Sequence, residues 1–296
     1  TYINMFWQPI NNLSNFYNQI TTNIAGAERI FEVLDTEPEI QEENGAKELP
    51  PINGNVKFEN VTFAYDSDSE NVLENVNFEI KAGETIALVG ATGAGKSTII
   101  NLISRFYETN SGRVLIDGYD IKKVTIESLR QQMGIMTQEN FIFSGTISEN
   151  IKYGKLDATD QEVVEAAKAV NAHNFIMKLK NGYDTLLSER GGGLSVGQKQ
   201  LIALARTMIS KPKILILDEA TSSIDTKTEL LVQKGIEEIL KGRTSFVIAH
   251  RLSTIKKADR IFVIGNRNII EEGTHKQLLE KKGVYYSLYR AQFDEV

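Results

Sequence analysis

A glycine-rich segment directly after an apolar run ends in a lysine followed by two hydroxyl residues. Residues 90–98 read Gly-Ala-Thr-Gly-Ala-Gly-Lys-Ser-Thr, between the strand-like residues 86–89 and a helix-like stretch at 98–106. In such a loop the backbone N–H groups and the helix N-terminus bind phosphate oxygens, the lysine neutralises β- and γ-phosphate charge, and the serine can ligate Mg²⁺. The segment therefore predicts a nucleoside triphosphate site made of Gly90, Thr92, Gly93, Ala94, Gly95, Lys96, Ser97 and Thr98.

Two adjacent carboxylates end a second apolar run. Residues 214–219 read Ile-Leu-Ile-Leu-Asp-Glu, which places the carboxylates at the carboxyl edge of a buried strand, where open α/β sheets bind ligands. Asp218 would hold Mg²⁺, through water, and Glu219 would polarise the attacking water. Acidic residues also end strands as helix caps. Beside a phosphate loop, the catalytic interpretation is favoured.

A helix start lies shortly before these carboxylates. Residues 194–198 read Leu-Ser-Val-Gly-Gln and open a helical stretch at 199–210. Ser195 and Gln198 have the spacing of a capping box. A capped helix N-terminus with free N–H groups also binds anions, so the segment can be both a helix start and a phosphate contact.

The order of these motifs resembles the nucleotide-binding domain of ABC transporters, from about residue 56 to the C-terminus. The matching order is the phosphate loop, Gln138, residues 194–198, Asp218 with Glu219, the Ser-Ser-Ile-Asp run at 222–225, and His250. The resemblance implies ATP and Mg²⁺ as cofactors and a head-to-tail dimer with two ATP molecules in its interface. It also implies a P-loop NTPase (RecA-like) α/β core with an antiparallel β subdomain and an α-helical subdomain.

The resemblance assigns further roles. Gln138 would reach Mg²⁺ and the attacking water, and His250, at the end of an apolar run, would contact the γ-phosphate; with Glu219 they form the expected catalytic set. Ser195, Gly197 and Gln198 would face the γ-phosphate of the ATP held by the opposite domain.

Two assignments have strong alternatives. Tyr65 resembles the aromatic residue that stacks on adenine, a contact worth about 1–3 kcal/mol by analogy with base stacking. It could instead pack with Val61 and Phe63 on one strand face, but the adenine contact is favoured. Asp225 resembles an aspartate that crosses the dimer interface, but it also fits the N-cap of a helix at 226–241.

The N-terminal segment indicates which ABC proteins are most similar. Residues 26–35 resemble the segment that joins the last membrane helix of an exporter half-transporter to its ATPase domain, and Glu189-Arg190-Gly191 resembles the exporter element that touches the membrane domain. Apolar residues from Ile10 to Leu34 recur in steps of three and four, which predicts one long amphipathic helix.

These features give an expected domain plan. Residues 1–34 would be the cytoplasmic extension of the last transmembrane helix, 35–54 a linker too rich in Pro, Gly and Glu to bury a core, and 55–296 the nucleotide-binding domain, with its helical subdomain at about 139–211. The implied partners are the transmembrane domain of the same full-length chain and a second half-transporter. The implied location is the cytoplasmic face of the cell membrane.

Residue 196 is valine where the family pattern usually has glycine. A glycine can approach phosphate closely or adopt φ > 0, whereas valine adds bulk and disfavours positive φ. With valine at this position, residues 194–198 should bind phosphate poorly, although the chain's own Lys96, Asp218, Glu219 and His250 are intact. This combination resembles one half of bacterial heterodimeric multidrug exporters. A heterodimer is therefore favoured, and a homodimer that tolerates Val196 is the alternative.

Composition excludes some other classes. The 296 residues are 41% hydrophobic and contain no cysteine, so the chain can bury a core but cannot form disulfides or thiolate zinc sites. The net charge of −6 disfavours nucleic-acid binding. An ABC ATPase that acts on DNA is therefore the less favoured alternative, and a clamp that binds ATP without hydrolysing it is disfavoured because Glu219 and His250 are present.

No run reaches the roughly 20 apolar residues that span a bilayer.

Hydrophobic patterns predict the strands. Short β-rich runs at 56–65 and 72–80 predict an antiparallel, hairpin-like entry. Continuous apolar runs at 85–90, 214–218, 244–250 and 260–264 predict buried parallel strands.

Overall fold

The computed structural model describes residues 2–66, 69–137, 141–218, 226–249 and 252–293. The chain divides into two compact units, Thr1–Gln41 and Glu42–Val296, which are described separately below.

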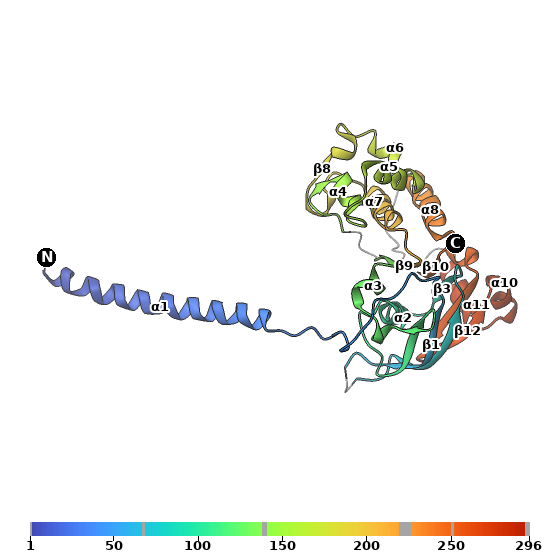
Figure 1. Cartoon of the computed structure of the whole chain (residues 1–296), viewed down its shortest axis with the longest axis horizontal. Coiled ribbons are helices and arrows are strands. Elements are labelled where there is room, and N and C mark those ends of the chain that lie inside the picture. The colour runs from blue at the N-terminus through green and yellow to red at the C-terminus, as the bar shows by residue number, and fades with distance from the viewer. Residues whose placement is uncertain (1, 67–68, 138–140, 219–225, 250–251, 294–296) are drawn as a thin grey trace. The chain divides into compact units, whose positions relative to one another are not determined.

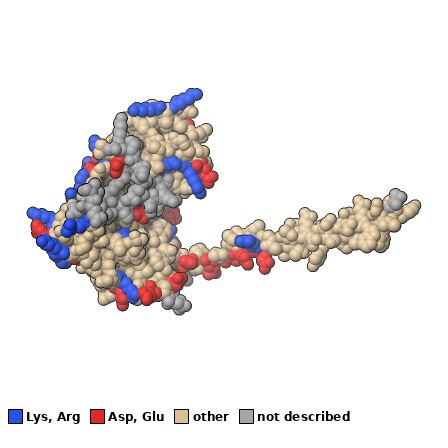
Figure 2. Space-filling model, turned by 180° about the vertical axis from the view of Figure 1, so that it is seen from behind, with Lys and Arg blue, Asp and Glu red and all other residues tan. Residues whose placement is uncertain are grey.

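The first unit is dominated by one helix, α1 (Tyr2–Leu34). All of its described side chains are exposed, among them Phe6, Trp7 and Leu13, and most are uncharged, as the tan helix in Figure 2 shows. Nowhere in the described residues does a helix combine the length and apolar character needed to cross a bilayer.

The core of the second unit is a mostly parallel sheet, in the strand order β12-β11-β3-β10-β9-β6. Its strands are β3 (Thr85–Val89), β6 (Met133–Met136), β9 (Ile214–Asp218), β10 (Thr244–Ile248), β11 (Arg260–Gly265) and β12 (Asn268–Gly273). The predicted parallel strands β3, β9, β10 and β11 are confirmed. Sequence patterns missed β6, which pairs in parallel with β9, and β12, which pairs antiparallel with β11.

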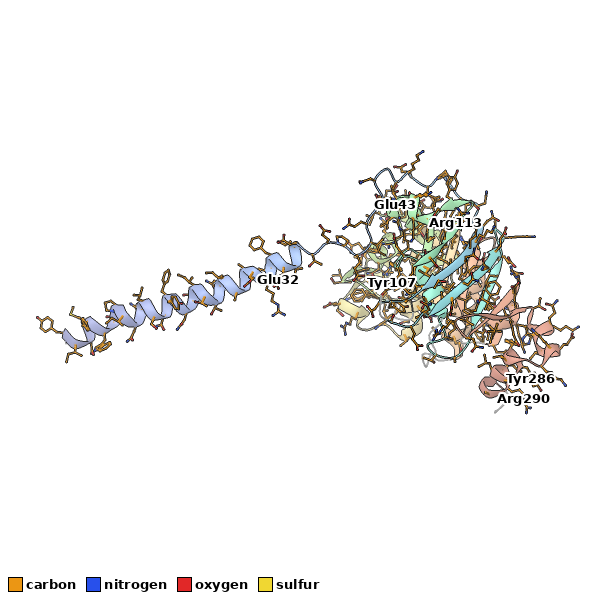
Figure 3. The ribbon with its side chains drawn as sticks, turned by 90° about the horizontal axis from the view of Figure 1, so that it is seen from below. Glu32, Glu43, Tyr107, Arg113, Tyr286 and Arg290 are labelled. Carbon is orange, nitrogen blue, oxygen red and sulfur yellow. The ribbon has the colours of Figure 1, made fainter. Side chains whose placement is uncertain are left out.

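A smaller antiparallel sheet has the order β2-β1-β4-β5. It consists of β1 (Val56–Phe63), β2 (Leu73–Ile80), β4 (Ser111–Ile116) and β5 (Tyr119–Asp120). The predicted antiparallel pairing of the first two strands is confirmed. Arg113, labelled in Figure 3, forms an ion pair of 2.6 Å with Glu59 across β4 and β1.

Helices cover the sheets and form the helical subdomain (Figure 1). The α-helices of this unit are α2 (Lys96–Ile103), α3 (Ile126–Arg130), α4 (Ile147–Lys152), α5 (Asp160–Ala169), α6 (His173–Ile176), α7 (Val196–Ile209), α8 (Thr226–Leu240), α9 (Leu252–Lys257), α10 (His275–Lys281) and α11 (Val284–Phe293). Short 3₁₀ turns are η1 (Ile121–Lys123), η2 (Gly182–Asp184) and η3 (Glu189–Gly191). Within the region predicted to be helical, β7 (Gly145–Thr146) and β8 (Leu186–Leu187) add a short antiparallel pair.

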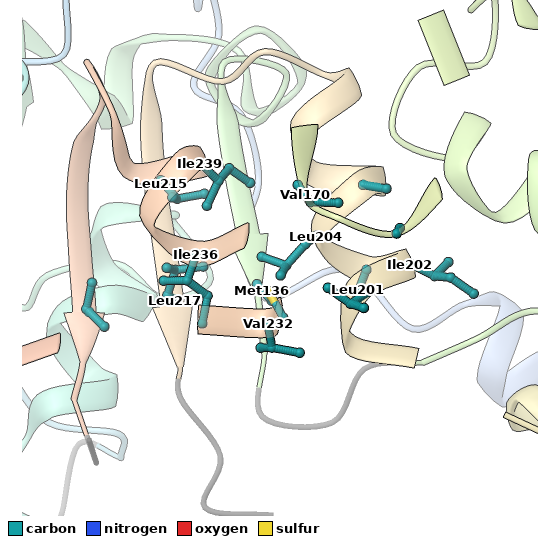
Figure 4. Packing of buried hydrophobic residues seen from close by; sticks show 14 of the residues in the cluster. Met136, Val170, Leu201, Ile202, Leu204, Leu215, Leu217, Val232, Ile236 and Ile239 are labelled. Carbon is teal, nitrogen blue, oxygen red and sulfur yellow. The ribbon is translucent and has the colours of Figure 1, made fainter. Parts of the chain in front are cut away.

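Each face of the parallel sheet packs against a different layer. Because side chains alternate along a strand, Leu215 and Leu217 of β9 join one core with α5, α7 and α8, whereas Ile214 and Ile216 join another core with α2 and the antiparallel sheet. Figure 4 shows Leu215 beside Ile239 and Leu217 beside Ile236, both isoleucines belonging to α8. Burial on both faces explains why these strands are continuously apolar.

The segment expected to be a solvated linker is partly built into the second unit. Leu49 and Ile52 are only 5% and 3% exposed and belong to the same core as α2. The expectation that residues 35–54 bury no core is therefore wrong for these two residues. Local composition does not reveal this burial, because the residues that bond to Leu49 and Ile52 lie far along the chain.

Candidate nucleotide site

The glycine-rich loop joins β3 to α2 and depends on glycine at three positions. Gly93 and Gly95 have φ of 80° and 105°, a left-handed backbone that favours glycine. At Gly90, a Cβ atom would lie 2.4 Å from the carbonyl oxygen of Ile264. The strand, loop and helix order expected from the sequence is thus observed, with Gly95 as the N-cap of α2.

The Lys96 ammonium lies across this loop. Its Nζ donates to the carbonyl oxygens of Gly90 and Ala91, both at 2.8 Å. Burial lowers the pKa of Lys96, and the negative charge of Asp218 partly opposes this effect. Since both carbonyl acceptors are neutral, phosphate oxygens could replace them and form stronger, charge-assisted bonds with the ammonium.

The candidate metal ligands in the described residues are Ser97 and Asp218. Ser97 is exposed in the first turn of α2, and Asp218 is half-buried at the carboxyl end of β9. Among the residues that the structure describes, no group of three His, Cys, Asp or Glu side chains could hold a metal ion. This sparse set suits Mg²⁺, which in nucleotide sites is held by one or two protein ligands together with phosphates and water.

Tyr65 lies just beyond the end of β1 rather than on its face. Its hydroxyl is 3.0 Å from Oγ1 of Thr98, and its ring meets those of Phe63 and Tyr107 edge-on, with centroids 4.9 and 5.0 Å apart. The side chain is still 45% exposed. Both expected roles therefore remain compatible with the geometry, because the ring packs on its neighbours and still offers exposed surface.

Sequence reasoning missed Tyr107 as a neighbour of the candidate adenine contact. Tyr107, labelled in Figure 3, follows α2 and also meets Phe63, with ring centroids 5.7 Å apart. No local pattern marks it, since it is one aromatic residue beside another in a turn.

The expected catalytic residues follow the carboxyl ends of neighbouring strands. Strands β6, β9 and β10 end at Met136, Asp218 and Ile248, and adjoin one another in the sheet. Gln138, Glu219 and His250 come one or two residues later in the sequence and lie outside the described residues, as does Asp225.

The predicted capping box at α7 is confirmed. The Ser195 Oγ accepts from the Gln198 backbone N–H at 3.3 Å, and the Gln198 Oε1 accepts from the Ser195 N–H at 2.9 Å. Gly197 is buried, whereas Ser195 is exposed. The N-terminus of α7 is thus formed and faces solvent in this chain.

Val196 is the first residue of α7 and is 50% exposed. It is not among the residues with positive φ, so the expected backbone conflict is absent: valine adopts the helical conformation here without strain. Only the bulk of its exposed side chain, beside the N-terminus of α7, could therefore interfere with a phosphate.

A surface cavity of about 690 Å³ adjoins the outer side of the loop. It is lined by loop residues 91–94, by Val72 and Ile264, and by Val284 and Leu288 of α11. Its described lining includes neither Lys96 nor Tyr65. The cavity therefore shares loop residues 92–94 with the expected nucleotide site but not its lysine or its candidate adenine contact.

Comparison with known proteins identifies the family. The ABC transporter family matches residues 73–222, which span the phosphate loop, α7 and β9. The chain belongs to the ABC transporter family, and its second unit is an ABC ATPase domain, which binds ATP.

Individual relatives are longer than this chain. It is 50% identical over 294 residues to YfiC, an ABC transporter ATP-binding protein of Bacillus subtilis, covering 99% of this chain and 48% of the relative. It is 48% identical over 291 residues to the ATP-dependent lipid A-core flippase of Syntrophus aciditrophicus, covering 98% and 48%. A solved bacterial Atm1-family ABC exporter with ATP bound matches at 40% identity with a TM-score of 0.84, covering 99% of this chain and 51% of that one. The chain thus spans about half the length of these relatives.

Proposed function

We propose that this chain is the Mg²⁺-dependent ATPase motor of an ABC exporter. ATP binding would close two ATPase domains, and hydrolysis would reopen them and drive export across the membrane. The longer relatives support a transmembrane domain in the same full-length chain and a position on the cytoplasmic face of the membrane, and they favour this function over an ATPase that acts on DNA.

One structural observation carries the proposal. In the part of the chain that the structure describes, α2 and α7 each present an N-terminus suited to phosphate, and these helices pack in the cores on opposite faces of the parallel sheet. A single triphosphate on Lys96 uses the first. We propose that the second, at Ser195, contacts the γ-phosphate of ATP held by another ABC domain in a head-to-tail dimer.

The catalytic roles in this proposal follow from chemistry at the carboxyl edge of the sheet. Asp218 and Ser97 would position Mg²⁺, which supplies charge stabilisation to the transferred phosphoryl group. Glu219 would accept the proton of the attacking water. Gln138 and His250 would contact Mg²⁺ with the water and the γ-phosphate, respectively, and Tyr65 would stack on adenine.

We further propose that the second half-transporter is a different chain. Because Val196 places a branched side chain beside the N-terminus of α7, this chain would present a weak phosphate clamp to its partner. The partner would contribute its own segment corresponding to residues 194–198, with the usual glycine in place of valine, to the ATP held by Lys96 and Asp218 of this chain.

Replacing Val196 with glycine is expected to raise ATP turnover by the isolated chain about tenfold, if turnover is limited by one poorly formed phosphate hydrogen bond worth about 1–1.5 kcal/mol. Phosphate release measured against protein concentration tests this expectation. Val284→Gly is a matched control, because Val284 also begins a helix, α11, and is 45% exposed. Robust, cooperative turnover by the parent chain that Val196→Gly does not improve would support a homodimer instead.

A further inference from the structure

The residues that enter the second unit cross the amino ends of strands in the parallel sheet. We call residues 42–55 the entry strap. It contains Pro50 and Pro51, which have no N–H to satisfy, and its remaining backbone groups from Leu49 to Asn55 are bound largely by side chains of distant segments.

Gln132 is the first anchor of the entry strap. Its Nε2 donates to the carbonyl oxygens of Leu49 at 3.2 Å and Pro50 at 3.0 Å, and its Oε1 accepts from the Ile52 N–H at 2.9 Å. Gln132 directly precedes β6, and its own carbonyl accepts from the N–H of Lys213, which directly precedes β9, at 3.0 Å. Gln132 thus connects the strap, through its side chain, to the amino ends of β6 and β9, through its own backbone.

Thr244, the first residue of β10, is the second anchor. Its buried Oγ1 donates to the Gly54 carbonyl at 2.7 Å and accepts from the Gly83 N–H at 3.0 Å. The contact is close, because Gly54 has φ of 106° and a Cβ atom there would lie 2.7 Å from this oxygen. The Thr244 N–H also donates to the Lys213 carbonyl.

Two further groups hold the strap against the domain. The Asp117 carboxylate accepts the N–H groups of Asn53, Gly54 and Asn55; burial raises its pKa, but these bonds outweigh burial and the pKa is lowered. Ser128 Oγ accepts from the Leu49 N–H at 2.8 Å. The strap is therefore hydrogen-bonded to the rest of the domain at several points.

The three anchored strands, β6, β9 and β10, are the strands that lead in sequence to Gln138, Asp218 with Glu219, and His250. We infer that Gln132 and Thr244 are positioning residues that couple the entry strap to the catalytic edge of the sheet. Packed, hydrogen-bonded strands transmit small displacements as units, and coupling between two sites is reciprocal. Nucleotide at the carboxyl edge should stabilise the strap, and the state of the strap should influence the catalytic residues.

This inference rests on the proposed function, because it requires nucleotide at the loop that holds Lys96. It adds a path of energetic coupling, within one chain, from the segment that follows α1 to the ATPase site. The route uses the amino edge of the sheet, opposite to the edge that binds ATP.

Hydrogen exchange of the whole chain, with and without saturating Mg²⁺ and a non-hydrolysable ATP analogue, tests the inference. In the parent chain, nucleotide should slow exchange of the Ile52 and Gly54 amides by about threefold or more. In Gln132→Ala this response should be lost, while the Kd for the analogue stays within about twofold of the parent value. A purely structural anchor would leave these amides protected but insensitive to nucleotide.

Gln131→Ala is the matched control, because the neighbouring Gln131 amide bonds to Glu127 within α3 and not to the strap. It should keep the full response. If the alanine variant does not fold, Gln132→Glu replaces it. This variant retains an acceptor for the Ile52 N–H but loses both donor bonds to the strap, and should also lose the response. The inference would be overturned if bound nucleotide did not affect exchange of the strap amides in the parent chain, or if folded Gln132 variants kept the full response. If the parent chain failed to bind the analogue, the proposed function would be overturned as well.

Discussion

Lys96→Ala is expected to weaken binding of Mg²⁺·ATP by about 100-fold. The ammonium lies half-buried across the loop and bonds to two carbonyl oxygens, so it is placed to form charge-assisted bonds to phosphate. Two such bonds, at about 1.5 kcal/mol each, correspond to a loss of about 3 kcal/mol. Titration calorimetry with ATP measures the change directly.

A second lysine provides the control for this prediction. Lys122 is also partly buried and donates to a backbone carbonyl, that of Thr109, at 2.9 Å, but it lies outside the glycine-rich loop. Lys122→Ala should leave the Kd for ATP within about twofold of the parent value. A folded Lys96→Ala protein with unchanged ATP affinity would contradict the assignment of the phosphate loop.

Glu219→Gln is expected to preserve ATP binding but to slow hydrolysis by about 10²–10⁴-fold, the usual contribution of a positioned general base. Glutamine keeps the size of the side chain but cannot accept the proton. ATP should then hold the two domains together, so sedimentation should show an ATP-dependent dimer in the presence of the proper partner chain.

The control for this substitution is another glutamate, Glu238. Glu238 forms an exposed ion pair with Lys241 at 2.6 Å on α8, and exposed pairs contribute little. Glu238→Gln should therefore hydrolyse ATP at the parental rate. If Glu219→Gln also turned over at that rate with its partner, Glu219 would have no role as the base.

The sequence predicted the parts of the fold that local patterns determine. The loop glycines and the apolar runs of β3, β9 and β10 each carry their signal within a few residues, and the capping box of Ser195 and Gln198 is a purely local arrangement. Strand β6 was missed because it is four residues long and includes Gly134, which packs against Pro212 and Thr207. Its place in the sheet is set by pairing with β9.

Other features depend on contacts between distant segments. Leu49 and Ile52 lie in a segment whose prolines and glutamates indicate a linker, and their burial depends on Ser128 and Gln132, about 80 residues later. Likewise, the contact of Tyr65 with Tyr107 and Thr98 arises only when β1 and α2 come together. Of the two reasons for glycine at position 196, close approach to phosphate or a positive φ, the second does not apply, because position 196 lies in the first turn of a helix and has no positive φ.

The most direct test of the account is phosphate release by the full-length protein in lipid vesicles, supplied with ATP and Mg²⁺ or with ATP and excess EDTA. We expect saturable release with Mg²⁺ and release at background with EDTA, because in the proposed site Ser97 and Asp218 would hold the metal that organises the phosphates for attack. If ATP bound in the presence of Mg²⁺ and the partner chain but no phosphate were released, the proposal that this chain is a hydrolytic motor would be contradicted.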